Sequence, residues 1–212
     1  MLTPDDGRND GEFRRYLEQP DRWRHYDPEL YDGLRQLLKP TWPRSVAHAE
    51  QWELVPEARY HRAIVPVGVV ARRAYFDAAV DSLNGTDMVF FDPDNGIEVP
   101  SVGKGSAAAP KYVRWDEIGE VYRRGQSVLI YQHYPRKPRE RFEEELCGRV
   151  RNETGAHRVD VFATKMVAFV ALSHARHEAQ MGQASTALME RWGKEFRQRH
   201  ARGAIETTES ID

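Results

Sequence analysis

The chain of 212 residues carries 31 Lys and Arg residues against 33 Asp and Glu residues, for a formal net charge of −2 at pH 7. This balance excludes a polycation, and a mean hydropathy of −0.72 without any long apolar run predicts no membrane span. A single cysteine, Cys147, excludes an internal disulfide framework. Because no secretory signal opens the sequence, we expect a cytoplasmic protein.

The first part of the chain is expected to contain few core elements. Residues 1–12 are polar and turn-forming, and are expected to be a flexible start. Residues 27–38 predict a helix, since an aspartate is a suitable N-cap and a proline fits the first helical turn. Residues 44–50 are expected to form a short strand. Residues 62–70 are apolar, but an internal proline favours an edge or irregular segment.

From residue 71 onward, helical patterns alternate with apolar runs. Helices are expected over residues 71–83, 111–125, 138–155 and 183–200, and strands over residues 87–91, 127–134, 157–164 and 166–175. The first two strands are apolar throughout, which is typical of strands buried on both faces. The last two are expected to form a hairpin. A Gly- and Ala-rich loop at 100–110 is expected to be mobile, and residues 201–212 to be a frayed tail.

This order of elements predicts the α/β class in a single domain over residues 1–212. The sheet is expected to be Rossmann-like and mainly parallel, with a C-terminal antiparallel hairpin, because the intervening helices supply the crossovers that parallel strands need. In such sheets, ligands bind beyond the carboxyl ends of the strands. We therefore expect a cleft where the strands at 87–91 and 127–134 end.

Asp92, Pro93, Asp94, Asn95 and Gly96 directly follow the first of these strands. A carboxylate at the end of a buried strand is held rigidly and partly desolvated, which suits proton acceptance or cation binding. The proline restricts the preceding aspartate to an extended backbone, and the glycine permits a positive φ or a close ligand approach. The alternative is an ordinary tight turn, since all of these residue types are common in turns.

Gln132 and His133 end the second strand and are expected to face the same cleft. The histidine could act as a general base or a ligand, or could merely cap the sheet through hydrogen bonds. Lys111 and Arg136 add positive charge nearby. Arg136 belongs to a basic run at 134–141 that could contact phosphate, although a solvated helix start would have the same composition.

The order of strand, Asp-Pro, polar loop, helix and strand resembles Rossmann-type methyltransferases that act on exocyclic amines and carry Asp-Pro-Pro-Tyr or a close variant. The large-subunit ribosomal RNA adenine-N6 methyltransferases are the nearest of these, and their final strand is also antiparallel. The motifs FDPDNG (91–96), KYV (111–113) and YQH (131–133) are similar to those of an uncharacterised bacterial family, over residues 27 to 200.

This resemblance implies S-adenosylmethionine as the cofactor and a nucleic acid as the substrate. Asp92 and the Pro93 carbonyl would accept the hydrogens of an amino group and so orient its nitrogen. Asp94 departs from the family's second proline, and Asn95 replaces the aromatic residue that stacks on the base. No glycine-rich cofactor loop is recognisable. We therefore expect that the first βα unit has degenerated or lies upstream of Met1.

Two other functions fit the same residues. Asp92, Asp94 and Glu98 could bind Mg²⁺ or Mn²⁺ in a nuclease or phosphodiesterase. The chain could also be a non-catalytic binding or regulatory module on a methyltransferase-like scaffold, because fold does not fix function. The candidate catalytic residues are Asp92, Asp94 and His133, and the candidate substrate-binding residues are Pro93, Asn95, Gly96, Glu98, Lys111, Gln132 and Arg136.

Overall fold

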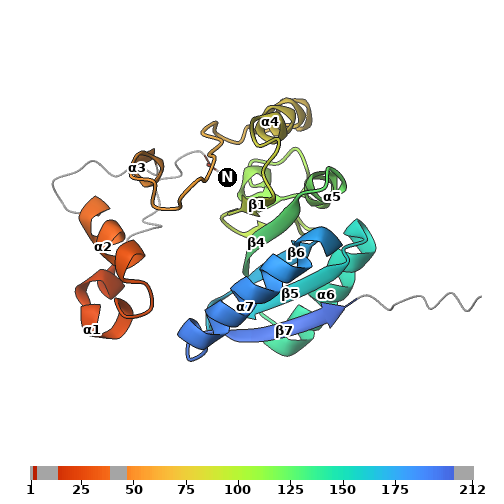
Figure 1. The fold of residues 1–212 in the computed structure, drawn as a ribbon. Helices are drawn as coiled ribbons and strands as arrows, with labels where there is room; N and C mark the ends of the chain where they lie inside the picture. Colours follow the sequence, from red (N-terminus) through yellow and green to blue (C-terminus); the bar gives the residue numbers. More distant parts are fainter. Residues whose placement is uncertain (1, 4–13, 39–46, 203–212) are drawn as a thin grey trace, which may run out of the picture. The chain divides into compact units, whose positions relative to one another are not determined.

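The structure, a computed structural model, describes residues 2–3, 14–38 and 47–202. The chain divides into two compact units, an N-terminal unit over Leu2–Ile64 and a C-terminal unit that begins at Val65 (Figure 1). The single domain expected over 1–212 stays a prediction. Residues 4–12 of the predicted flexible start lie outside the described residues.

The N-terminal unit is built from short helices: η1 (Arg15–Glu18), α1 (Pro20–Trp23), α2 (Pro28–Leu37) and α3 (Ala47–Gln51). Asp27 accepts a hydrogen bond from the backbone N–H of Leu30 at 3.0 Å, so the predicted N-cap of α2 is confirmed. The predicted strand at 44–50 is wrong in its described part, because α3 occupies it. Its first three residues lie outside the described part of the chain.

The C-terminal unit alternates helices with strands. Its elements are α4 (Val69–Ser82), β1 (Met88–Phe91), β2 (Gly96–Ile97), η2 (Ala109–Lys111), β3 (Tyr112–Val113), α5 (Trp115–Arg123), β4 (Ser127–His133), α6 (Arg139–Thr154), β5 (Arg158–Ala163), β6 (Val167–Ser173), η3 (Ala175–His177), α7 (Glu178–Trp192) and β7 (Arg197–Arg202). The helices and strands predicted between residues 71 and 175 are confirmed with small differences at their ends, with one exception. The helix predicted over 111–125 begins only at Trp115, because Lys111 ends η2 and Tyr112–Val113 form β3. The predicted helix at 183–200 ends early, because its last part forms β7.

The main sheet has the strand order β1-β4-β6-β5-β7. Strands β1 and β4 pair in parallel, whereas β4–β6, β6–β5 and β5–β7 pair antiparallel. The predicted hairpin is confirmed as β5–β6, but the prediction of a mainly parallel sheet is wrong. The reason is that β6 inserts between β4 and β5, which run in the same direction, and so separates them. The fold is α/β with a mixed sheet.

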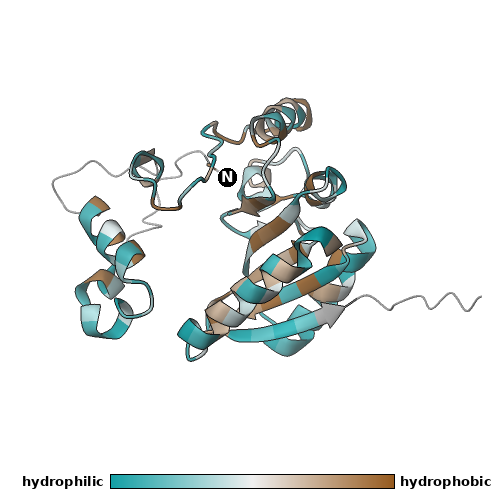
Figure 2. Ribbon diagram, viewed as in Figure 1, coloured by the Kyte–Doolittle hydropathy of each residue, from teal (hydrophilic) through white to brown (hydrophobic). Residues whose placement is uncertain are grey.

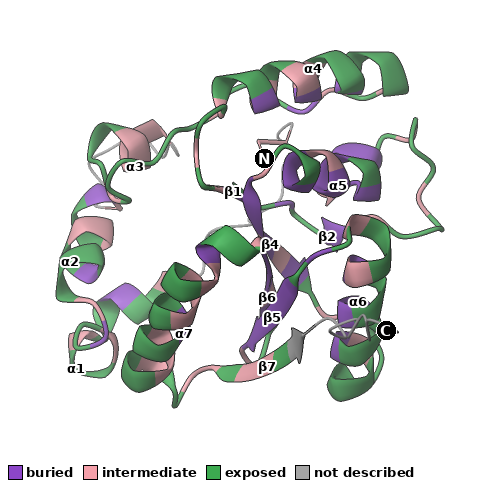
Figure 3. Cartoon of the chain, turned by 45° about the vertical axis from the view of Figure 1, so that its right-hand side comes forward, coloured by how far each residue is buried: buried purple, intermediate pink, exposed green. Residues whose placement is uncertain are grey.

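One face of the sheet is fully covered and holds the core. Alternate strand residues with no solvent exposure project onto it, namely Val128, Ile130, Val159, Val161, Val170 and Leu172, and α5 and α6 contribute Ile118, Val121 and Val150. Figures 2 and 3 show these strands as apolar and buried. Because side chains alternate along a strand, the residues between them project onto the opposite face. On that face, α7 lies over β5 and β7.

Within the described residues, the only β pairing before β1 is an isolated bridge between Leu2 and Ile64. The segment that leads into α4 contains one glycine, Gly68, with a φ of 97° at the N-cap. This segment is not a strand followed by a glycine-rich loop.

Candidate functional site

The carboxyl ends of β1 and β4 lie side by side, because the two strands are parallel and Phe91 is opposite Ile130. The continuation of each strand places Asp92 beside Tyr131. The Asp92 side chain is exposed, yet the surrounding protein desolvates it enough to raise its pKa; the charge of Asp94 adds to this rise, and His133 opposes it. Burial, and then the charge of Asp92, raises the pKa of Tyr131. The structure therefore brings Asp94 and His133 within electrostatic reach of Asp92.

An exposed aromatic surface adjoins Asp92 on the same face of the sheet. Phe90 precedes it by two residues and is 51% exposed. The ring of Tyr131 meets the rings of His133 and Phe169 edge-on, with centroids 5.0 and 5.4 Å away. Tyr131 and Phe169 are partly exposed and His133 is exposed. This part of the sheet therefore offers flat apolar area next to a carboxylate.

Gln132 follows Tyr131 on β4 and therefore projects onto the opposite face of the sheet, where Gly96 lies against it. Gln132 is 6% exposed; its Oε1 accepts from the Ile97 N–H at 2.9 Å and its Nε2 donates to the His133 carbonyl at 2.7 Å. A Cβ atom on Gly96 would lie 2.6 Å from the Gln132 amide. The glycine is thus required for close approach of the protein's own side chain, and both residues brace β2 against β4.

Glu98 and Lys111 also serve local structure. The Glu98 carboxylate accepts from the Trp115 N–H at 2.9 Å, at the start of α5, and the Lys111 carbonyl accepts from the Asn95 N–H at 2.9 Å. Glu98 lines a pocket of 360 Å³ with Trp115, Arg149 and the loop around Lys104. Pro93 is buried, whereas Asn95 is exposed. The segment 95–98 is thus tied to η2, β3 and the start of α5, and is more than a free surface turn.

The basic run after β4 is partly neutralised. Lys137 and Arg141 both pair with Glu145, and Arg139 stacks over the Tyr134 ring at 5.1 Å. Arg136 is exposed. This side chain is the one in the run best placed to meet an external phosphate.

The carboxylates do not form a metal site of the expected kind. Among the described residues, no group of three or more His, Cys, Asp and Glu side chains could hold a metal ion. Asp92 and Asp94 lie together, but Glu98 is directed to the backbone of α5. The residues present therefore do not fit the Mg²⁺ or Mn²⁺ expectation.

A pocket for S-adenosylmethionine was expected near a glycine-rich loop after an early strand. In the described part of the chain, the segment 52–68 that leads into α4 contains one glycine, Gly68. Val65, three residues before it, is fully buried. This backbone does not fit the usual cradle for the cofactor, so no chemical step is derived through it.

Sequence reasoning missed several charged groups in the C-terminal unit. Arg72 and Glu117 are buried and paired between α4 and α5, and Arg158, Asp160 and His200 cluster between β5 and β7. The one available signal was the alternation of polar and apolar residues in "RVDVFA", which placed two charges on one face of an otherwise buried strand.

Comparison of the chain with protein-family models, with curated proteins and with solved structures finds no match. Within the described residues, no helix has both the length and the apolar character that crossing a bilayer requires.

Proposed function

We propose that the chain is a nucleic-acid-binding protein on a methyltransferase-like scaffold, which holds an amine-bearing base against the open sheet face at the ends of β1 and β4. The observation that carries this proposal is the position of Asp92, beside Tyr131 and on the same face as Phe90. Aromatic side chains stack on bases, and a carboxylate accepts hydrogen bonds from an exocyclic amine.

The aromatic surface compensates for a departure from the methyltransferase pattern. Asn95 offers no ring on which a base could stack, but Phe90 and Tyr131 supply rings from the strands themselves. Exposed aromatic residues on a sheet face are a recurrent means of holding single-stranded bases. Arg136 adds a positive charge that could contact the phosphate backbone of a nucleic acid. The net charge of the protein, −2, would not by itself attract that backbone.

The test is binding of short single-stranded oligonucleotides of adenosine, cytidine or uridine, followed by fluorescence anisotropy. Phe90→Ala is expected to weaken binding of all three, because loss of one stacked base costs about 1–3 kcal/mol. Met166→Ala is the matched control, since Met166 is 76% exposed on the turn between β5 and β6. Equal losses of oligonucleotide affinity in both variants would contradict the proposal that bases stack on Phe90.

Asp92→Ala separates base recognition from general affinity. It is expected to weaken binding of adenosine and cytidine oligonucleotides, which carry exocyclic amines, by about tenfold or more, because a hydrogen bond to a charged group contributes about 1.5–3 kcal/mol. Binding of uridine oligonucleotides should remain or improve. Asp81→Asn, which removes a carboxylate 75% exposed on α4, is the control. An unchanged preference between adenosine and uridine would sink the proposed role of Asp92.

Methyl transfer is the second candidate function, and the resemblance around Asp92-Pro93 favours it. A heat-shift titration with S-adenosylmethionine decides it, since a ligand that binds the folded state raises the Tm by mass action. The same titration with Mn²⁺ tests the nuclease alternative. A shift with neither compound, together with oligonucleotide binding, leaves a binding module as the function.

A further inference from the structure

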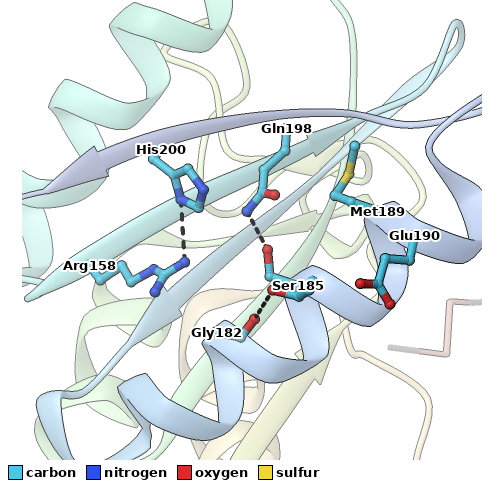
Figure 4. Close-up of a pocket in the computed structure, with 8 residues that line it drawn as sticks. Arg158, Gly182, Ser185, Met189, Glu190, Gln198 and His200 are labelled. Atoms are coloured by element: carbon cyan, nitrogen blue, oxygen red, sulfur yellow. Dashed lines mark hydrogen bonds between the residues drawn. The ribbon is translucent and has the colours of Figure 1, made fainter.

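A groove of about 740 Å³ lies between α7 and the strands β5 and β7, away from the candidate site (Figure 4). Its walls carry side chains from all three elements: Arg158, Gly182, Ser185, Thr186, Met189, Glu190, Gln198 and His200. This volume is within the range of small-molecule sites, about 300–1,000 Å³.

Small residues on α7 create the groove. Gly182 and Ser185 lie one turn apart on the side of the helix that faces the sheet, and Ser185 is 6% exposed. A Cβ atom on Gly182 would lie 3.9 Å from the Nη1 atom of Arg158. Large side chains here would fill the space above Arg158, so the groove follows directly from the sequence of α7.

Buried polar side chains that are hydrogen-bonded to one another form the floor of the groove. Arg158 is 6% exposed, and Asp160 is fully buried. The Nε and Nη2 atoms of Arg158 donate to the Asp160 carboxylate at 2.6 and 3.3 Å. Within the described residues, no hydrogen bond occupies Nη1, which lies below Gly182. A guanidinium carries five N–H donors, so this edge remains available to an acceptor in the groove.

His200 completes this end of the groove. Its Nδ1 atom lies against the Asp160 carboxylate and 3.3 Å from Arg158 Nη2, which leaves Nε2 as the other polar edge of the ring. Nearby, Gln198 Nε2 donates to Ser185 Oγ at 2.5 Å. Amide and hydroxyl groups therefore line the middle of the groove.

The opposite end carries the other sign of charge. Figure 4 shows Arg158 and His200 at one end, and Met189 and Glu190 at the other. Glu190 is exposed and lies eight residues after Gly182, which corresponds to about 12 Å along a helix. Because the Asp160 carboxylate already balances the charge of Arg158, and Glu190 adds a second negative charge to the groove, an isolated anion gains little net attraction. A ligand with an oxyanion at one end and an ammonium group at the other complements both ends.

We propose that this groove binds a short zwitterionic peptide, with its C-terminal carboxylate at Arg158 Nη1 and its N-terminal ammonium at Glu190. An extended chain spans about 3.3–3.6 Å per residue, so roughly three residues bridge the two ends. The amide of Gln198 and the hydroxyl of Ser185 face the peptide groups, and Met189 provides apolar contact. This site is separate from the oligonucleotide surface and does not depend on it.

The test uses triglycine, its C-terminal amide and its N-acetyl derivative, with affinities measured from the NMR shift of the Met189 methyl group. Triglycine is expected to shift this signal saturably. The C-terminal amide should bind at least tenfold more weakly, because it removes the partner of Arg158. Equal binding of the amide, or no saturable shift with triglycine, would overturn the proposal.

Three variants locate the ligand without disturbing the Arg158–Asp160 pair. Gly182→Leu fills the groove and should abolish the shift, whereas Gly182→Ala, whose Cβ makes ordinary contact, should bind as the native chain does. Glu190→Gln should weaken triglycine several-fold but leave the N-acetyl derivative unchanged. Binding retained in Gly182→Leu places the peptide elsewhere. An equal effect of Glu190→Gln on both peptides contradicts the assigned orientation.

Discussion

Arg72 on α4 and Glu117 on α5 form a buried, two-point ion pair, with Nε–Oε1 at 2.7 Å and Nη2–Oε2 at 2.8 Å. The arginine is 1% exposed and also donates to the carbonyls of Ala109 and Tyr112 at 3.2 and 2.7 Å. Glu117 in turn accepts from the Arg114 N–H at 2.9 Å. One charged network therefore fastens α4, α5 and the segment before α5 beside the candidate site.

Replacement of Arg72 by methionine is expected to destabilise the C-terminal unit by about 3–5 kcal/mol, because Glu117 would remain buried without its cation. Urea unfolding followed by circular dichroism measures this loss. The neighbouring Arg73→Ala is the control, since Arg73 pairs with Asp77 and Glu120 while 56% exposed, and such pairs contribute little. Similar midpoints for the two variants would show that the buried network is not required.

Gly96→Ala is expected to destabilise the fold by about 1–3 kcal/mol, because φ at this position is 95° and the new methyl group would meet the Gln132 amide. Gly105→Ala is the matched control, since open space surrounds its Cβ position and its φ is not positive. The difference between the two midpoints in thermal unfolding is the measurement. If Gly96→Ala has the same midpoint of thermal unfolding as the native protein, Gln132 does not brace β2 against β4.

Much of the C-terminal unit could be predicted, because apolar runs bounded by turn residues leave a strong local signal. The carboxyl ends of β1 and β4 could be paired in advance for the same reason. Strand order could not, since the insertion of β6 between β4 and β5 depends on contacts between residues far apart in the sequence. Nothing local in either strand specifies its neighbour. The prediction that β1 is buried on both faces is wrong, since Phe90 is 51% exposed.

Charged residues account for the other differences. The buried residues of α4 are Arg72, Phe76 and Val80, and an arginine is not expected among them from the sequence. Arg72 is hidden because its partner lies on α5. In the same way, the sequence of β7 does not predict a strand, because Arg197 and Arg199 pair with Glu143 on α6. From the sequence alone, a charged residue whose partner is distant cannot be told from a surface residue.

Cys147 is expected to be unreactive toward a thiol reagent such as Ellman's reagent while the chain is folded. The residue is 4% exposed on α6, and burial raises the pKa of its thiol, which lowers the fraction of reactive thiolate. Since the sequence contains 1 cysteine, labelling in concentrated urea should reach one thiol per chain. Rapid labelling of the native protein would contradict the packing of α6 against the sheet.

Asp92→Asn is expected to raise the Tm at neutral pH while it weakens recognition of amine-bearing bases. Desolvation raises the pKa of Asp92 in the folded state, so the folded protein holds the proton more tightly than the unfolded chain. The ionised group therefore costs stability above its folded pKa. This cost shrinks as the pH falls, and it vanishes below the unfolded value of about 4, where both states are protonated. Thermal melts of the native chain and of Asp92→Asn across this range measure the difference. The gain of the variant should be full at neutral pH and should disappear in acid; a gain that persists in acid would mean that the carboxylate is not held in a desolvated position suited to accepting hydrogen bonds.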